Sequence, residues 1–262
     1  MNESQSAEIA AIVRETFVAD VAWLQEIDST NSYIARGNVA AHQLPWLVVA
    51  EQQTAGRGRE RNQWWSGPGA LTFSLALRPS ALHLPSEKWP LLSLAVGVAV
   101  REVLAVNYGL NDVRVKWPND VYANQKKICG ILIESHPYDP LTLIIGIGLN
   151  VNNSVRNAPD EILVLATSMA DELGRDESIR EVLKEVLMSI KKQIEQVSLD
   201  SQTVIDRHRE SCYLTGKFIE LRAGATEVSG HCLGIDDDGA LRMQTVTGVQ
   251  RFHAGSVKVV RG

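Results

Sequence analysis

The feature that most constrains the fold of this 262-residue chain is a change of pattern near residue 213. Before it, apolar segments of strand length alternate with longer segments of helical character. After it, the short β-prone segments KFIELR, VSGHCLGID, ALRMQTV and SVKVV are separated by turn signals, most clearly at Asp236-Asp-Asp-Gly239. This pattern predicts a large domain over residues 1–213 and a small β-barrel or sandwich over residues 214–262.

Helices and strands of the larger domain can be predicted from hydrophobic spacing. Residues 178–197 place apolar side chains at i, i+3, i+4 and i+7, which predicts one long helix with a buried face. Residues 86–106 predict a second helix, whose apolar run Leu91 to Val100 is too short to cross a bilayer and is expected to be buried. Strands are predicted at VAWLQEID, WLVVAEQQ, ALTFSLAL, VRVKW, KICGILIES and LTLIIGIGLNVN, with a hairpin turn at Ala-Asn-Gln before KICGILIES.

Composition excludes several broad classes of protein. A net charge of −5 argues against a surface that coats nucleic acid, so any anion site is expected to be local. The three cysteines form no CxxC motif and the six histidines show no zinc spacing. The N-terminal segment MNESQSAEIAAIVRETF lacks the apolar core of a secretion signal. We therefore expect a cytoplasmic protein with reduced thiols and no membrane association.

The stretch QTAGRGR, from Gln53 to Arg59, follows the predicted strand WLVVAEQQ. Its glycine spacing is neither that of a phosphate-binding P-loop nor that of a dinucleotide fingerprint. Guanidinium groups bind phosphate or carboxylate with paired donors, and glycines let backbone N–H groups approach an anion. With Trp64 and Trp65 close behind, the stretch fits a lid that orders over a flat ligand. The alternative is a flexible surface turn with solvated arginines.

Two further motifs carry chemistry. In KWPND, Lys116 ends a strand in which Val113 and Val115 face one side and Arg114 and Lys116 the other. The lysine is either an ordinary exposed side chain or an ammonium aimed into a cavity, where it could stabilise phosphoryl charge. In GIGLN, Asn150 ends a glycine-containing strand and either binds a ligand or caps a turn.

Taken together, these motifs resemble the biotin–protein ligases, also named biotin–[acetyl-CoA-carboxylase] ligases. DSTN, EQQTAGRGR with the following Trp and Ser, KWPND, KKICGILIE and GIGLNVN occur in that family's order and spacing, and ATSM at residues 166–169 extends the match. The resemblance covers about residues 20–260. It implies an α+β fold, with a central mixed β-sheet flanked by helices as in class II synthetases and a small C-terminal SH3-like β-barrel.

The resemblance also implies a reaction. Biotin and ATP, with Mg²⁺ on the phosphates, give biotinyl-5′-AMP, and the biotinyl group then passes to a lysine of a biotin carboxyl carrier protein. Lys116 and Arg57 are the implied catalytic residues. The implied biotin-binding residues are Ser29, Thr30, Asn31, Gln53, Arg57, Gly58, Arg59, Lys116, Gly130, Ile131 and Leu132. The implied nucleotide-binding residues are Arg57, Arg59, Trp64, Asn119 and Asn150, while Asp120 and the metal ligands stay unassigned.

Some expectations depart from the family or stay open. Glu60 follows GRGR where the family often has more Gly and Arg; it either weakens anion attraction or points outward. Only 28 residues precede Ser29, so no DNA-binding domain of the family's bifunctional members is expected. A homodimer is an open possibility, and the strand LTLIIGIGL is either a sheet edge for it or internal. The alternative functions are a lipoate or octanoate ligase or transferase, and a non-catalytic biotin-binding regulator.

Overall fold

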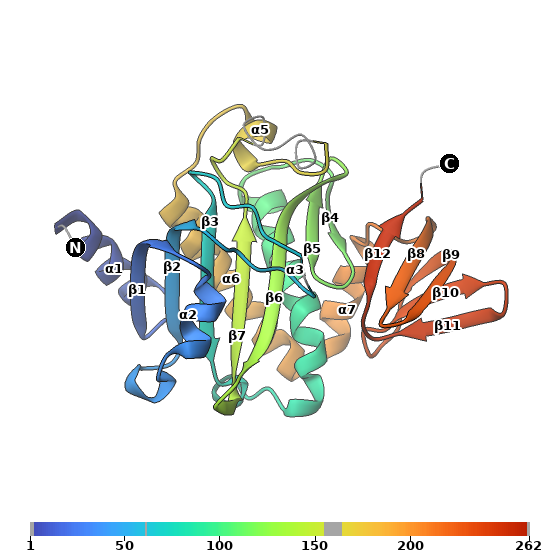
Figure 1. Cartoon of the computed structure of the whole chain (residues 1–262), viewed down its shortest axis with the longest axis horizontal. Coiled ribbons are helices and arrows are strands. Elements are labelled where there is room, and N and C mark those ends of the chain that lie inside the picture. Colours follow the sequence, from blue (N-terminus) through green and yellow to red (C-terminus); the bar gives the residue numbers. More distant parts are fainter. Residues whose placement is uncertain (1–2, 61, 155–163, 261–262) are drawn as a thin grey trace.

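The computed structural model describes residues 3–60, 62–154 and 164–260, and arranges them in two β-sheets with helices on the larger one (Figure 1). The strands of the central sheet are β1 (Asp20–Ile27), β2 (Trp46–Gln53), β3 (Leu71–Leu77), β4 (Val113–Lys116), β5 (Asp120–Ala123), β6 (Lys126–His136) and β7 (Asp139–Leu149). Those of the second sheet are β8 (Phe218–Ala223), β9 (Thr226–Ile235), β10 (Leu241–Thr245), β11 (Gly248–Phe252) and β12 (Ser256–Val259). The described α-helices are α1 (Glu3–Glu15), α2 (Thr30–Arg36), α3 (Leu92–Glu102), α5 (Met169–Leu173), α6 (Ile179–Leu199) and α7 (Ser201–Glu210).

The central sheet is mixed, as predicted. Its strand order is β1-β2-β3-β7-β6-β5-β4; β1 and β2 run parallel and the other neighbours are antiparallel. The segment LTLIIGIGL could have been a sheet edge or internal; it is internal, because β7 lies between β3 and β6 and offers no free edge. The hairpin turn before β6 is confirmed, with Asn124 and Gln125 both at positive φ (46° and 66°), as its two central residues require.

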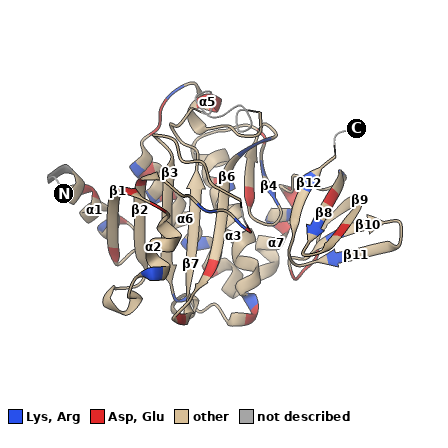
Figure 2. Cartoon of the chain, in the orientation of Figure 1, with Lys and Arg blue, Asp and Glu red and all other residues tan. Residues whose placement is uncertain are grey.

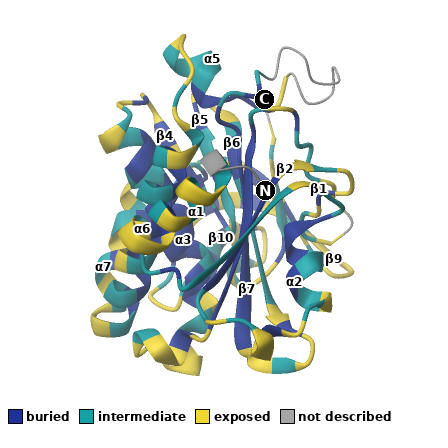
Figure 3. Ribbon diagram, turned by 90° about the vertical axis from the view of Figure 1, so that its left-hand side faces the viewer, coloured by how far each residue is buried: buried dark blue, intermediate teal, exposed yellow. Residues whose placement is uncertain are grey.

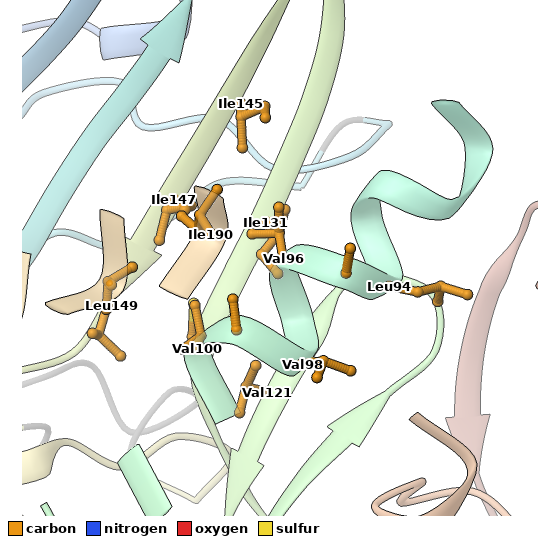
Figure 4. Packing of buried hydrophobic residues seen from close by; sticks show 14 of the residues in the cluster. Leu94, Val96, Val98, Val100, Val121, Ile131, Ile145, Ile147, Leu149 and Ile190 are labelled. Carbon is orange, nitrogen blue, oxygen red and sulfur yellow. The ribbon is translucent and has the colours of Figure 1, made fainter. Parts of the chain in front are cut away.

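Helices cover the two faces of the sheet unequally. Figure 3 shows α3, α6 and α7 on one side and the short α2 on the other. On the first side, apolar residues of α3 pack against Ile131, Ile147 and Leu149 of the sheet (Figure 4). On the other side a small cluster around Ile34 and Trp46 holds α2. The larger cluster provides the main core, and the α2 side leaves part of the sheet uncovered for a site.

The predicted helices form with adjusted ends. Ser178 caps α6 by accepting a hydrogen bond from the Glu181 N–H, and the apolar face is buried as its spacing predicted. The segment 86–106 is divided: Pro90 lies in a 3₁₀ segment (Ser86–Leu91), α3 follows, and Val103–Asn107 forms a π-helical turn. By length and composition the stretch Ser86–Asn107 could cross a membrane, but 61% of its most apolar window is buried in the fold, as in the core helix of a globular domain.

The second sheet has the order β11-β10-β9-β8-β12 and is antiparallel throughout, which fits an SH3-like domain. The α+β architecture is therefore confirmed, whereas the division at residue 213 stays a prediction, with β8 beginning at Phe218.

The connecting residues 211–213 run along β4, since Val115 N–H donates to Ser211 O at 2.9 Å and Tyr213 N–H donates to Val115 O at 2.7 Å. The Trp117 indole N–H donates to Gly239 O at 3.0 Å, which ties the predicted Asp236–Gly239 turn to the KWPND segment.

Candidate functional site

A cavity of about 260 Å³ lies where α2, the QTAGRGR loop and strands β4 to β7 meet the start of β12. Both arginines of the loop and Lys116 line it, so the cations from two distant segments share one space. Figure 2 shows acidic and basic residues interspersed over both sheets, which agrees with an anion site that is local. The predicted site residues that line the cavity are Ser29, Thr30, Asn31, Gln53, Arg57, Gly58, Arg59, Trp64, Lys116, Asn119, Gly130, Ile131 and Leu132.

Glycines of β6 and β7 form the floor of this cavity. A Cβ on Gly146 would lie 2.1 Å from Asn31 Oδ1, and one on Gly148 would lie 2.3 Å from Trp64 Cε2. A Cβ on Gly130 would lie 3.2 Å from the Lys127 side chain. Neighbouring side chains therefore approach the strand backbone only because these positions carry no side chain of their own.

A buried polar cluster stands on this floor. Ser74 Oγ donates to Asn31 Oδ1 at 2.6 Å and lies 2.7 Å from Thr30 Oγ1. The Asn31 amide donates to Leu132 O at 3.3 Å and to Glu134 Oε2 at 2.8 Å. Gln53 Oε1 accepts from the Thr30 N–H at 2.8 Å. Both amide hydrogens of Asn31 are used inside the protein, so this residue shapes the pocket, and the Ser29 hydroxyl and the Gln53 amide nitrogen have more capacity for a ligand.

The QTAGRGR loop folds into a hairpin over the cavity. Gly58 N–H donates to Asn62 O at 2.8 Å and Trp64 N–H donates to Gly56 O at 2.9 Å. Arg57 pairs with the Glu134 carboxylate. A lid that orders over its ligand should be poorly ordered around residues 56–63 in a ligand-free crystal; this stays a prediction, and Arg61 within that range lies outside the described residues.

The loop also reaches the second sheet. Arg59 donates to Gly255 O at 3.0 Å, and the Glu60 carboxylate lies 3.1 Å from Arg222 Nη2 on β8. Glu60 is thus paired with a residue of the second sheet. Ser256 and Val257 of β12 complete the cavity wall, so the second sheet contributes to the site.

Two lysines face the cavity with different partners. Lys127 lies 2.6 Å from Asp120 Oδ1. Burial alone would lower the pKa of Lys127, but the charge of Asp120 and the hydrogen bond to it, with smaller contributions from Tyr122 and Cys129, together raise that pKa. Lys116 donates to the Tyr122 hydroxyl at 3.1 Å, and burial lowers its pKa against the attraction of Asp120. Lys127 is therefore the more firmly charged of the two at neutral pH.

The ring of Trp64 lies on the glycine floor beside the Lys127 ammonium, whose distance to the ring centroid is 5.9 Å. Its indole N–H has no acceptor among the described residues, so it is free to donate to a ligand. Ile131 reaches the site through its backbone, since its carbonyl accepts from Asn119 Nδ2 at 2.6 Å while its side chain is buried in the core.

One predicted residue, Asn150, does not line the cavity. Its amide donates to Thr167 O at 2.9 Å, and its Oδ1 accepts from Asn153 at 2.9 Å, so it caps the turn after β7. Its role as a nucleotide ligand stays a prediction. Sequence reasoning missed Lys127, Glu134, Ser74 and the two glycines of β7 as site residues, although all but Ser74 lie in quoted motifs.

Metal binding by the protein alone has little support in the part of the chain that the structure describes, where no three His, Cys, Asp or Glu side chains gather. Asp120 offers one carboxylate to the cavity, and it is paired with Lys127. This donor set suits an ion such as Mg²⁺, which commonly binds through one or two carboxylates and the phosphates of a nucleotide.

Comparisons with known sequences agree with this geometry. Residues 23–152 match the model of the biotin/lipoate A/B protein ligase family. The chain is 32% identical over 222 residues to the biotin–[acetyl-CoA-carboxylase] ligase of Mycobacterium tuberculosis, covering 81% of this chain and 79% of that protein. It is 30% identical over 243 residues to the enzyme of the same name from Paracoccus denitrificans, covering 89% and 98%. A match to the bifunctional ligase/repressor BirA of Bacillus subtilis is 35% identical over 218 residues, covering 81% of this chain but only 66% of that longer relative.

Solved structures give the same fold. The biotin protein ligase from Aquifex aeolicus in complex with biotin and ATP superposes with a TM-score of 0.81 at 29% identity, covering 92% of this chain and 100% of that one. The biotin protein ligase from Leishmania major in complex with biotinyl-5-AMP gives a TM-score of 0.60 at 25% identity, covering 90% and 99%.

Proposed function

The chain belongs to the biotin–protein ligase family, and from this premise we propose that it activates biotin with ATP and transfers the biotinyl group to a lysine of a biotin carboxyl carrier protein. One observation carries the proposal: Arg57, Arg59 and Lys116 line the same cavity as the polar cluster at Ser29–Asn31. Cations alone would suit any phosphate ligand. A polar cluster beside them supplies donors and acceptors for the urea ring of biotin.

The first step joins biotin to the nucleotide. A biotin carboxylate oxygen attacks the α-phosphorus of ATP, an O–P bond forms, and pyrophosphate leaves with the electron pair of the broken P–O bond. Negative charge gathers where carboxylate and phosphates crowd together, so fixed positive charge nearby lowers the barrier. Arg57, Arg59, Lys116 and Lys127 supply that charge from two directions.

The second step transfers the acyl group. The ε-amine of the acceptor lysine attacks the biotinyl carbonyl carbon, an amide forms, and AMP leaves with the electron pair of the broken C–O bond while the amine loses a proton. The mixed anhydride is labile in water, and the hairpin over the cavity with the Trp64 ring beneath it shields the anhydride. Holding biotin and nucleotide on one rigid floor also reduces the entropy cost of the attack.

Mg²⁺ is proposed as a companion of ATP. The phosphates would provide most of its ligands. Two carboxylates line the cavity, and of these Asp120 lies beside Lys127, whereas Glu60 is paired with Arg222 of the second sheet, so Asp120 is the protein ligand that we propose. Bound there, the ion would neutralise charge on the leaving pyrophosphate.

An isotope-exchange assay tests the proposal. We expect pyrophosphate–ATP exchange that depends on biotin, and we expect no exchange when lipoate replaces it. Lys116→Ala should reduce this exchange by about 100-fold or more, the scale of lost transition-state stabilisation, with an unchanged circular dichroism spectrum. Lys126→Ala is the matched control, because this exposed lysine at the start of β6 does not line the cavity, and the variant should keep full activity. Exchange supported only by lipoate would reassign the substrate, and full turnover in Lys116→Ala would remove this lysine from its role.

A further inference from the structure

Tyr122 lies between the two lysines of the cavity. In the β4–β5 pair Lys116 is opposite Asp120 and Arg114 is opposite Tyr122, so Lys116, Asp120 and Tyr122 project from the same face. On the other side Tyr122 is opposite Lys127 of β6. Asp120 is paired with Lys127, which leaves the phenolic oxygen as the described hydrogen-bond acceptor for Lys116, at 3.1 Å.

The position of the Tyr122 ring is fixed by packing against Tyr213. It stacks on Tyr213, with ring centroids 4.8 Å apart and planes inclined by 25°. The Tyr213 backbone is bonded to Val115, the residue before Lys116, and the Lys217 ammonium lies 3.2 Å from the centroid of the Tyr213 ring. These contacts place the Tyr122 hydroxyl at a fixed point beside the cavity.

We propose that Tyr122 is the positioning residue for Lys116, holding its ammonium toward the reacting carboxylate and phosphate; this rests on the function proposed above. A lysine side chain has several rotatable bonds, and holding it in one place costs conformational entropy. Because the Tyr122 hydroxyl already holds the lysine in the folded protein, this entropy is lost on folding and not when the substrate binds. An ammonium has three donors, so one bond to Tyr122 leaves two for substrate oxygens, one on biotin and one on the α-phosphate.

The hydroxyl also affects the charge of Lys116. The groups that face this ammonium are Asp120, Lys127, Tyr122 and Tyr213. Burial and the Lys127 charge lower the pKa of Lys116, and Asp120 raises it. A hydrogen bond accepted from the ammonium favours its charged form, so loss of the hydroxyl should lower the pKa of Lys116 further.

The test compares Tyr122→Phe with Tyr213→Phe in the full-length enzyme. Both variants keep their rings, and only the first removes the acceptor from Lys116. For Tyr122→Phe we expect kcat of biotin-dependent exchange to fall about ten-fold, the scale of a hydrogen bond to a charged group, with KM for biotin and ATP nearly unchanged. The basic limb of the pH profile should move to lower pH. The ¹³Cε resonance of Lys116 should titrate at lower pH in this variant. It should move less in Tyr213→Phe, because Tyr213 makes the smallest of the contributions to the pKa of Lys116.

Two results would overturn the proposal. An unchanged kcat and pH profile in Tyr122→Phe would show that the hydroxyl does not act through Lys116. A loss of activity shared equally by both variants, with a lower unfolding temperature and an unmoved Lys116 resonance, would leave Tyr122 a purely structural role. Lys116→Ala separates this proposal from the proposed function: if that variant is inactive while Tyr122→Phe is normal, only the positioning role fails.

Discussion

Along β6 and β7, alternating residues of the same strands meet two different environments. Ile131, Ile147 and Leu149 point into the layer of α3 and α6, where they are buried in the main apolar cluster. On the opposite face Gly146 and Gly148 carry no side chain, and Asn31 and Trp64 rest directly on the strand backbone. One face gains stability by burying apolar area, at about 25 cal/mol per Å². The other gives up that stabilisation to keep room for a ligand.

The largest expected effect comes from filling the open face. In Gly146→Ala the new methyl would overlap Asn31 Oδ1, and Asn31 cannot retreat because its amide is bonded to Leu132 and Glu134. We expect biotin-dependent exchange to fall by about 100-fold or more, equivalent to about 3 kcal/mol. Biotin affinity measured by calorimetry should fall in parallel.

Gly97→Ala in α3 is the matched control on the packed face. A methyl there would meet Val115 and Ile131 at 3.7 and 3.9 Å, which is ordinary contact. Because alanine favours helix over glycine, we expect about 0.5–1 kcal/mol of added stability and unchanged exchange. Equal losses of activity in both variants would contradict the distinction between the two faces.

The helical layer on the packed face should also make the stability of the fold depend on acid pH. His208 of α7 is buried, and burial lowers its pKa to about 4, below the ordinary 6.5. Above pH 6.5 the imidazole is neutral in both the folded and the unfolded chain, so it does not change the free energy of unfolding with pH. As the pH falls below 6.5 the unfolded chain takes up a proton first, so stability declines down to about pH 4.

At pH 5 this difference should remove about 2 kcal/mol of the free energy of unfolding relative to pH 8, as judged from the two pKa values. Urea unfolding at both pH values measures it. His208→Leu should lose this part of the pH dependence, and an identical decline in the variant would assign the acid sensitivity to other groups.

The smallest expected effect concerns the charge at the rim of the open face. Glu134→Gln keeps an oxygen that can accept from Asn31 but removes the charge that faces Arg57. We expect KM for biotin to rise about five-fold, or about 1 kcal/mol, because the loop arginine is less firmly held. The exposed Glu26→Gln on β1 is the control and should change nothing. A loss as large as that of Gly146→Ala would mean that the variant had disturbed the Asn31 cluster as well.

Much of this architecture could be predicted from the sequence because its signals are local. The helical spacing of residues 178–197 and the order of the motifs need no knowledge of distant contacts. The roles of Lys127 and Glu134 could not be predicted in this way. Lys127 acquires its role from the register that places β6 beside β5, and Glu134 from contacts with residues 103 and 77 positions away.

Glu60 and Asn150 both show that the partners of a polar side chain depend on the fold. For Glu60 the sequence left two alternatives open, a weaker attraction for anions or an outward orientation; in the structure it pairs with Arg222, which is 162 residues away. For Asn150 the sequence left ligand binding and turn capping open; its side chain bonds Thr167 and Asn153 in the turn after β7, and its role as a nucleotide ligand stays a prediction. A polar residue in a motif indicates chemistry only when the fold leaves its atoms free, and that depends on packing.

The cover that residues 211–213 provide for β4 limits how copies of this chain could join. In the described part of the chain, one border strand of the central sheet is occupied by this segment and the other, β1, pairs only with β2. Two molecules that extended their sheets through β1 would each use their single available border. Growth by this route ends with a twofold-symmetric pair, so the fold cannot propagate into an open-ended fibre through its main sheet.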